Sequence, residues 1–390
     1  MQITYSFNGY ELRRQRYIQI SQQPRSSRYA IQPDPLYDPV RTFFQKYGPT
    51  GGFPFRLLAL LQATAIKKLA LPTSNILRFR ERSLLITGGL YLALNLRHPD
   101  LEIREQLGDF ASGFSHEFGV GCTALLASPL FNVPPDALNP IRVDPRKKAL
   151  DFAALRPDGQ GLLLMEAKGV TSKQSRSAAR QSIYGKKQDS GNTAVLVDRR
   201  TLTSTQVTKI GVIVQAACKR SNPALPPSTR GLIEIIDPEL DQDPIKVTDT
   251  DIIAGKYWHF AGIALFAGLN NVAEELAQRA IALAVGRKRA IQMQHYHLKP
   301  DREFRVEGHS LAGVQWQPSD VPQGSQDVWF YQAADWEYLS KILANEDFPH
   351  TVSYSPDTFS DRDDLVENMF SDGSYFGIGL HSQTGLRALQ

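Results

Sequence analysis

Large apolar residues along this chain fall into helical spacing in some stretches and into short continuous runs in others. Residues 101–118 place leucine and phenylalanine at steps of three and four, which predicts an amphipathic helix. After that helix come two short apolar runs, typical of strands, with a turn signal between them. The same spacing predicts further helices over residues 55–69, 75–96, 172–184, 204–220 and 261–290.

The two apolar runs are 148–156 and 161–168, and they flank the dipeptide Asp158-Gly159. Asp-Gly favours a two-residue hairpin turn, because both central positions of that turn need positive φ. Two later apolar runs, 192–197 and 231–236, predict further strands. Helices that alternate with strands in this order indicate an α/β fold, in which helices cover a mixed sheet.

Composition narrows the class of protein without identifying it. The chain has 390 residues, 42% hydrophobic and 22% charged, which excludes collagen-like, coiled-coil and wholly disordered proteins. It has two cysteines, Cys122 and Cys218, too few for a disulfide framework and too far apart for a zinc knuckle. The apolar run 84–96 is shorter than a membrane span needs, and the first residues lack the apolar core of a signal peptide. We therefore expect a cytoplasmic protein with no membrane partner.

Charge is unevenly distributed along the chain. The net charge of +4 combines a surplus of +14 in residues 1–300 with a deficit of −10 in residues 301–390. A basic body with an acidic end predicts an anionic partner for the body. It also raises the hypothesis of self-inhibition, in which the acidic end covers the basic surface until a partner displaces it. Two domains with ordinary but different surfaces would explain the same numbers.

The hairpin carries the chemistry of the sequence. If Asp158 and Gly159 form the turn, opposed residues have numbers that sum to 317, so Asp151 lies opposite Glu166 and Lys168 shares their face. Opposed Cβ atoms lie about 5 Å apart, and two like charges at that distance repel by about 3 kcal/mol at an effective dielectric of 20. A divalent cation, Mg²⁺ or Mn²⁺, would reverse the sign of that interaction, with the Ala167 carbonyl as a third ligand.

A further acid, Glu117, lies on the predicted upstream helix. Its helical neighbours Gly113, Gly121 and Ala124 are small, as a close contact between helix and sheet would require. Glu117 is therefore a candidate metal ligand that points toward the sheet. A solvated surface glutamate is the alternative interpretation.

The residues Asp151 (KALDFAAL) and Glu166-Ala167-Lys168 (LLLMEAKG) resemble the motif of the PD-(D/E)xK nuclease superfamily. The resemblance covers residues 101–237 and implies a three-layer αβα restriction-endonuclease-like core. It implies that Asp151 and Glu166 hold Mg²⁺, that Lys168 positions the attacking water, and that Glu117 is the first-helix acid. Gln181 and Tyr184 are similar to the Gln-Tyr element of RecB-like nucleases, with a spacing one residue shorter. Leu150 stands where the motif has proline.

Cations follow the motif on the next helix and strand. Such residues supply phosphate contacts in nucleic-acid-binding proteins. A solvated helix face is the alternative for each of them taken singly. The candidates for contact with nucleic acid are Lys173, Arg176, Arg180, Lys186, Lys187, Arg199 and Arg200.

These patterns divide the chain into a mostly helical section 1–100, a nuclease-like core 101–240, a helical connection 241–300 and a small acidic α+β module 301–390. The resemblance implies a metal-dependent nuclease that hydrolyses phosphodiester bonds in DNA, with RNA as the second substrate class. Restriction, repair, phage defence and toxin activity all remain open, as does assembly into oligomers. Two alternatives remain: a catalytically silent nuclease-fold protein that binds nucleic acid or serves as a scaffold, and an unrelated α/β enzyme.

Overall fold

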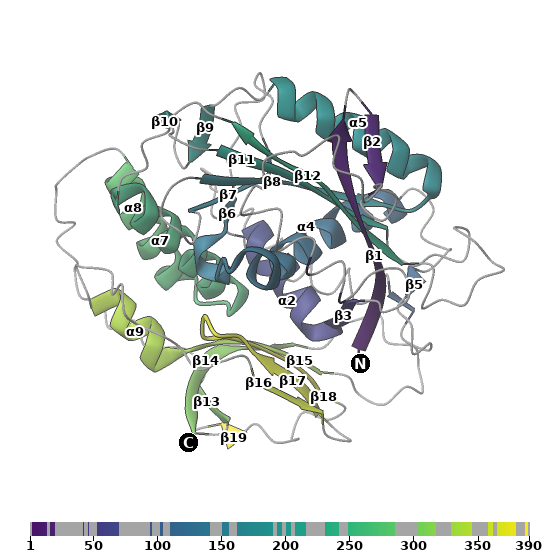
Figure 1. Ribbon diagram of the computed structural model, residues 1–390. Helices are drawn as coiled ribbons and strands as arrows, with labels where there is room; N and C mark the ends of the chain where they lie inside the picture. The colour runs from purple at the N-terminus through teal and green to yellow at the C-terminus, as the bar shows by residue number, and fades with distance from the viewer. Residues whose placement is uncertain are drawn as a thin grey trace. The chain divides into compact units, whose positions relative to one another are not determined.

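The structure is a computed structural model, and it divides into two compact units (Figure 1). Unit 1 comprises residues 1–64 and 89–248, and unit 2 comprises residues 65–88 and 249–390. Each is described by itself below. The described residues are 2–13, 16–19, 42, 46, 53–69, 94–95, 102–103, 110–140, 150–155, 162–189, 193–196, 200–203, 207–215, 231–241, 249–284, 303–306, 308–316, 329–344, 358–361, 365–379 and 387–388.

Unit 1 is built on a mixed sheet of eight described strands, which confirms the predicted α/β class. The strand order is β2-β1-β12-β11-β8-β7-β6, and β3 pairs with the first residues of β1. Strand β8 is central, parallel to β11 on one side and antiparallel to β7 on the other. The strands are β1 (Gln2–Arg13), β2 (Arg16–Gln19), β3 (Phe53–Arg56), β6 (Asn139–Pro140), β7 (Phe152–Leu155), β8 (Leu162–Val170), β11 (Val207–Gln215) and β12 (Leu232–Asp241).

The pairing of β7 with β8 confirms the predicted register. Phe152 pairs with Met165 and Leu155 pairs with Leu162, so opposed residue numbers sum to 317 as the Asp-Gly turn requires. The turn itself, residues 156–161, lies outside the described part of the chain. The ladder begins at Phe152, so Asp151 stands directly before its first pair.

Two helices cover opposite faces of this sheet (Figure 1). Helix α4 (Phe110–Phe131) packs so closely on β8 that a Cβ on Gly169 would lie 1.4 Å from the Ser115 carbonyl oxygen. Helix α5 (Lys173–Asp189) packs on the other face, where Ala179 and Ile183 form a core with Val170, Ile213 and Ile236. Because side chains alternate along a strand, Glu166 and Lys168 lie on the same face as Val170, toward α5.

The helix predicted over 204–220 is wrong, because that segment contains strand β11. Its sequence VTKIGVIVQ is rich in β-branched residues, which fit a pleated sheet better than a helix. Residues 208–215 are buried, as expected of a strand with neighbours on both sides. Apolar spacing alone did not distinguish a buried strand from a buried helix here.

The first hundred residues also differ from the mostly helical section expected. β1 runs through the unit 1 sheet, parallel to β12 and antiparallel to β2 and β3.

Helix α2 (Leu57–Leu69) matches the helix predicted over 55–69. The helix predicted over 75–96 lies outside the described residues except for strand β4 (Leu94–Asn95), which pairs with β5 (Glu102–Ile103). The helix predicted over 101–118 is α4, which begins at Phe110 and continues to Phe131.

Unit 2 combines helices with an antiparallel sheet of seven described strands, in the order β16-β17-β18-β15-β14-β13-β19. The long helix predicted over 261–290 is two helices, α7 (Asp249–Phe266) and α8 (Asn270–Ala284). Gly268 has a φ of +74°, which a continuous helix does not allow and which glycine adopts at low cost. The remaining elements are α9 (Trp336–Ala344), β13 (Glu303–Val306), β14 (His309–Trp316), β15 (Trp329–Asp335), β16 (Thr358–Asp361), β17 (Leu365–Met369), β18 (Ser374–Gly379) and β19 (Arg387–Ala388).

Unit 2 therefore contains both the connection and the acidic section that the sequence separated at residue 300. The sheet of the acidic section and helix α7 share a core, where the Phe266 ring meets the Phe376 ring edge-on, with centroids 5.7 Å apart. Several of its acids are used internally. Glu367 accepts a hydrogen bond from the Tyr375 hydroxyl (2.7 Å), and Asp335 accepts one from His309 Nδ1 (2.9 Å). These acids thus form contacts inside unit 2, so fewer acids of this section remain available for the predicted self-inhibition.

A buried polar chain joins three segments of unit 2. Lys67 Nζ donates to His259 Nδ1 (3.1 Å), and His259 Nε2 donates to Asp372 Oδ2 (2.9 Å). The other Asp372 oxygen accepts from the backbone nitrogen (3.0 Å) and the hydroxyl (2.6 Å) of Ser374. Burial raises the pKa of Asp372, but the hydrogen bonds from His259 and Ser374 outweigh it and hold the pKa below its ordinary value.

We expect Asp372→Asn to destabilise unit 2 by about 2 kcal/mol at neutral pH, because it removes the charged acceptor of these hydrogen bonds. An acid whose pKa is lowered in the folded state adds stability above its unfolded pKa and loses it as pH falls through the folded value. The difference between wild type and variant should therefore shrink below pH 4. Tryptophan fluorescence during urea unfolding measures it, since all four tryptophans lie in residues 249–390. A difference independent of pH would contradict the role given to the charge.

None of the described helices is long and apolar enough to cross a membrane.

Candidate functional site

The candidate site of unit 1 is assembled from three elements: the bend before β7, the middle of β8 and the last turn of α5. Asp151 supplies the bend, Glu166 and Lys168 lie on β8, and Lys186 lies on α5. The structure thus brings together Asp151, Glu166 and Lys168 as predicted. It adds Lys186, which the sequence assigned to contact with nucleic acid.

Asp151 is fixed by two hydrogen bonds to the β8 backbone. Its N–H donates to the Met165 carbonyl (2.9 Å), and its Oδ2 accepts from the Ala167 N–H (2.8 Å). The bond to Ala167 turns the Asp151 carboxylate along β8, beside Glu166. The Asp151 charge acts on Glu166, and Asp151 bends out of the ladder instead of pairing with Glu166 in it.

Glu166 is fully buried, with no exposed side-chain surface. The ammonium groups of Lys168 and Lys186 each lie 2.6 Å from its Oε1. Burial raises the pKa of Glu166, and the charge of Asp151 raises it further, while the two lysines lower it without cancelling the increase. An ionised Glu166 is therefore costly in this fold unless cations surround it.

Lys168 is cationic in this environment. Burial lowers its pKa, but attraction by the charges of Glu166 and Asp151 is stronger, so the pKa rises above its ordinary value. A lysine with a raised pKa stays protonated at neutral pH. Lys168 is thus suited to donate hydrogen bonds to a water or an anion and unsuited to accept a proton as a base.

The residues present fit a divalent cation. Within the described part of the chain no hydrogen-bond donor reaches Glu166 Oε2, a buried carboxylate oxygen. Carboxylate and backbone carbonyl oxygens are the ligands that hard cations prefer, and Asp151, Glu166 and Ala167 offer them on adjacent segments. Among the described residues no cluster contains three or more His, Cys, Asp or Glu side chains arranged for a metal. The site therefore offers two acidic side chains.

Glu117 stands on a different side of α4 from the contact with β8. Gly119 of α4 touches the backbone of Lys168 and Gly169, and Glu117, two positions earlier, is rotated from it by about 160° on an α-helix. Gly121, on the same helical face as Glu117, packs against Leu60 and Thr64 of α2. The charges that shift the pKa of Glu166 come from Asp151, Lys168 and Lys186. The role of Glu117 as a metal ligand stays a prediction.

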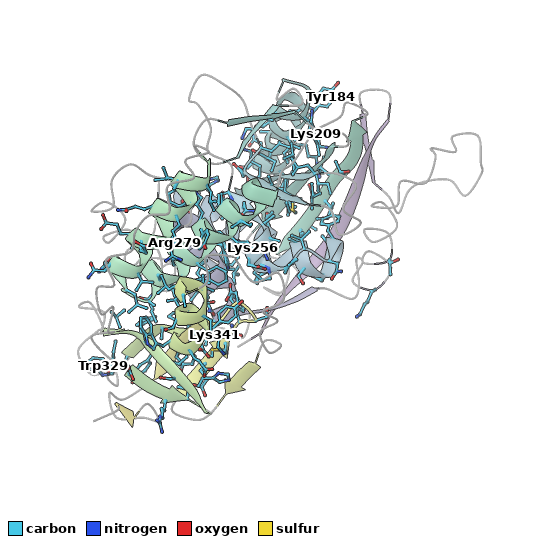
Figure 2. All side chains as sticks on the ribbon, turned by 90° about the vertical axis from the view of Figure 1, so that its left-hand side faces the viewer. Tyr184, Lys209, Lys256, Arg279, Trp329 and Lys341 are labelled. Carbon is cyan, nitrogen blue, oxygen red and sulfur yellow. The ribbon has the colours of Figure 1, made fainter. Side chains whose placement is uncertain are left out.

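Gln181 and Tyr184 lie on other faces of α5 than the one that meets the sheet. Gln181 is exposed, about 160° around the helix from the buried Ile183. Tyr184 is half-buried, and Figure 2 shows it at the outer edge of the molecule. The structure does not bring either residue into the cluster around Glu166.

Arg176 and Arg180 differ from the predicted nucleic-acid contacts, because both bind a buried acid of the sheet. Arg180 binds Glu234 through two nitrogens (Nε to Oε2 2.9 Å, Nη2 to Oε1 2.6 Å), and Arg176 Nη1 adds a third bond (3.0 Å). Glu234 on β12 is fully buried. These arginines therefore join α5 to the sheet. Glu234 was not predicted, although a lone acid within the apolar run LIEII signals a charge that needs a buried partner.

The other predicted contacts divide into buried and undescribed residues. Lys187 is 2% exposed, and its carbonyl accepts from Lys209 Nζ (3.0 Å), a residue of β11 labelled in Figure 2. A buried lysine does not present its charge to an external phosphate, so the structure gives this assignment no support. The side chains of Lys173 and Arg200, and all of Arg199, lie outside the described residues. For those three the assignment stays a prediction.

Comparison with protein family models, with curated proteins and with solved structures gave no match to this chain. The function is therefore argued from the site itself.

Proposed function

We propose that the protein is a metal-dependent nuclease with a restriction-endonuclease-like core in unit 1. The observation that carries this proposal is the junction of β7 and β8, where two carboxylates and a protonated lysine converge on a buried spot of a central strand. Such a cluster of ionisable groups with a perturbed pKa is typical of a functional site. The αβα layering of α4, the sheet and α5 is compatible with it.

Asp151 and Glu166 would hold Mg²⁺ or Mn²⁺ in the proposed reaction, and the Ala167 carbonyl would be a further ligand. The ion would supply Lewis-acid stabilisation of the phosphoryl group and a more acidic water. Asp151 is oriented for this by its bond from the Ala167 N–H. Lys168 donates from its ammonium to the water or to a phosphoryl oxygen, where it stabilises the negative charge that develops.

The proposed substrate is DNA, with RNA as the second class. Support comes from the resemblance of the motif and from the +14 charge of residues 1–300. The α5 arginines give no support, because Glu234 holds them. We place the protein in the cytoplasm, and assembly into oligomers and regulation through the acidic section remain proposals.

One observation favours a second candidate, a catalytically silent protein of the same fold. Lys168 and Lys186 together balance Asp151 and Glu166, so the cluster is electrically neutral without a metal. A protein that has lost catalysis would keep such a balanced set for stability or for binding nucleic acid. Metal dependence of cleavage separates the two candidates.

Purified protein should cleave DNA in Mg²⁺ or Mn²⁺ and lose this activity in EDTA. The substrates are plasmid, linear duplex and single-stranded DNA, and RNA, so that the substrate class is read from the same experiment. Lys168→Ala should lower the cleavage rate about a hundredfold, because it removes a charge-stabilising donor. Lys341→Ala, an exposed lysine paired with Glu337, is the matched control and should cleave as wild type does. Absence of cleavage, or equal rates for wild type and Lys168→Ala, would overturn the nuclease proposal.

A further inference from the structure

Glu166 Oε1 has two ammonium neighbours at 2.6 Å, which come from different elements. Lys168 is two residues along the same strand and is therefore tied to the same face as Glu166. Lys186 reaches the carboxylate from the last turn of α5, and about a quarter of its side chain is exposed (26%). Two like charges next to one oxygen repel each other, so the pair is held by the surrounding carboxylates.

The charges of this cluster are complete without a metal. Asp151 and Glu166 contribute two negative charges, and the lysines contribute two positive charges. A divalent cation added to the unchanged cluster would leave a surplus of two positive charges in a buried place. Such a surplus is unfavourable unless a cation leaves the site or an anion enters it.

We propose that Lys186 is an exchangeable cation at this site: in the metal-free protein it occupies the side of Glu166 Oε1 that a divalent metal ion takes when it binds. This inference rests on the metal site of the proposed function. The displaced ammonium, on a flexible four-carbon stem near solvent, becomes free to meet the phosphate of a substrate. Metal affinity is then low in the protein alone and rises when a phosphate-bearing substrate binds, since coupling between two ligands is reciprocal.

Lys186 suits this exchange better than Lys168 does. The stem of Lys168 starts on β8, two residues from Glu166 and on the same face of the sheet. The stem of Lys186 starts on a helix that covers the sheet, and it can turn outward without any change of backbone. Lys186→Met keeps most of the stem and removes the charge, which makes it the direct test.

The experiment measures Mn²⁺ affinity by isothermal titration calorimetry of the full chain, without nucleic acid. Lys186→Met should bind Mn²⁺ roughly tenfold more tightly than wild type or better, because it removes a competing positive charge. Lys186→Arg keeps the charge and should bind as weakly as wild type. Lys341→Met, which removes an exposed lysine charge from unit 2, should leave the affinity unchanged. Circular dichroism establishes that each variant is folded.

Glu166→Gln separates failure of this inference from failure of the metal site. If Glu166→Gln abolishes Mn²⁺ binding while Lys186→Met binds as wild type or more weakly, the exchange is wrong and the metal site stands. If Mn²⁺ binds wild type and Glu166→Gln equally, or binds neither wild type nor Lys186→Met, the metal site itself is wrong. Tighter binding by Lys186→Met, lost again in the double variant with Glu166→Gln, is the result that supports the exchange.

Discussion

Glu166→Gln should lower metal-dependent cleavage by about a thousandfold or more while unit 1 remains folded. The loss of activity follows from the position of Glu166, a carboxylate beside Asp151 on the central strand. Glutamine preserves the size of the side chain and removes the charge that holds a cation. The variant therefore tests the chemistry of the site without a change in packing.

The effect of the variant on stability has two opposed causes. Burial and the neighbouring charge of Asp151 raise the pKa of Glu166, so the folded protein holds the proton of this group more tightly than the unfolded chain does. The stability that the protonated group contributes is present at low pH and is lost as pH rises through the raised pKa. Glutamine removes this cost of the ionised Glu166 at neutral pH, but it also removes the carboxylate that balances Lys168 and Lys186, so the net change in stability is the difference between the two effects.

Hydrogen exchange of the β8 amides measures this effect, because unit 1 contains no tryptophan. The opening free energy of β8 in Glu166→Gln, relative to wild type, should rise as pH increases from about 4.5 toward neutrality. Loss of both activity and protection would show that Glu166 is needed for folding. Full activity in Glu166→Gln would contradict the proposed role of Glu166.

The hairpin shows what sequence reasoning predicts well. Two apolar runs and an Asp-Gly turn determine which residues of β7 and β8 face each other, because a register change of one residue would move every side chain to the other face. The bend at Asp151 was not predicted, since it depends on a hydrogen bond between its own side chain and the Ala167 N–H. A pattern of apolar residues contains no information on such a bond.

The basic residues of α5 show where sequence reasoning fails. Their periodicity is that of a solvated face, yet Arg176, Arg180 and Lys187 face the sheet. The deciding residue, Glu234, is more than fifty positions away in the chain, and only the tertiary structure brings it under α5. Local sequence therefore predicted helix α5 correctly and assigned its charged face to the wrong environment.

Removal of Glu234 should cause the largest loss of stability in unit 1. Glu234→Ala leaves Arg176 and Arg180, which are 15% and 24% exposed, without their buried partner. Breaking a buried ion pair by removal of one partner costs about 3–5 kcal/mol, because the remaining charge is poorly solvated. The expected result is a fall of that size in the free energy of unfolding of unit 1, measured by urea unfolding with circular dichroism.

A compensated variant distinguishes this mechanism from the loss of a catalytic group. The triple variant Glu234→Leu, Arg176→Met and Arg180→Leu replaces the ion cluster with apolar side chains of similar size, and such replacements are often neutral or stabilising. It should recover most of the stability that Glu234→Ala loses.

Cleavage by the folded triple variant then decides what the α5 arginines do. Because Glu234 holds both of them inside the fold, activity within about a few fold of wild type is expected, as for side chains that do not contact the substrate. If the triple variant is stable yet fails to bind DNA, Arg176 and Arg180 also contact the substrate. The two arginines would then have two states, one bound to Glu234 and one bound to DNA. Glu234 and Lys168 flank Ile213 of β11 in the same row of the sheet. Failure of the triple variant to bind DNA would therefore also place the substrate across the face of the sheet that carries Glu166.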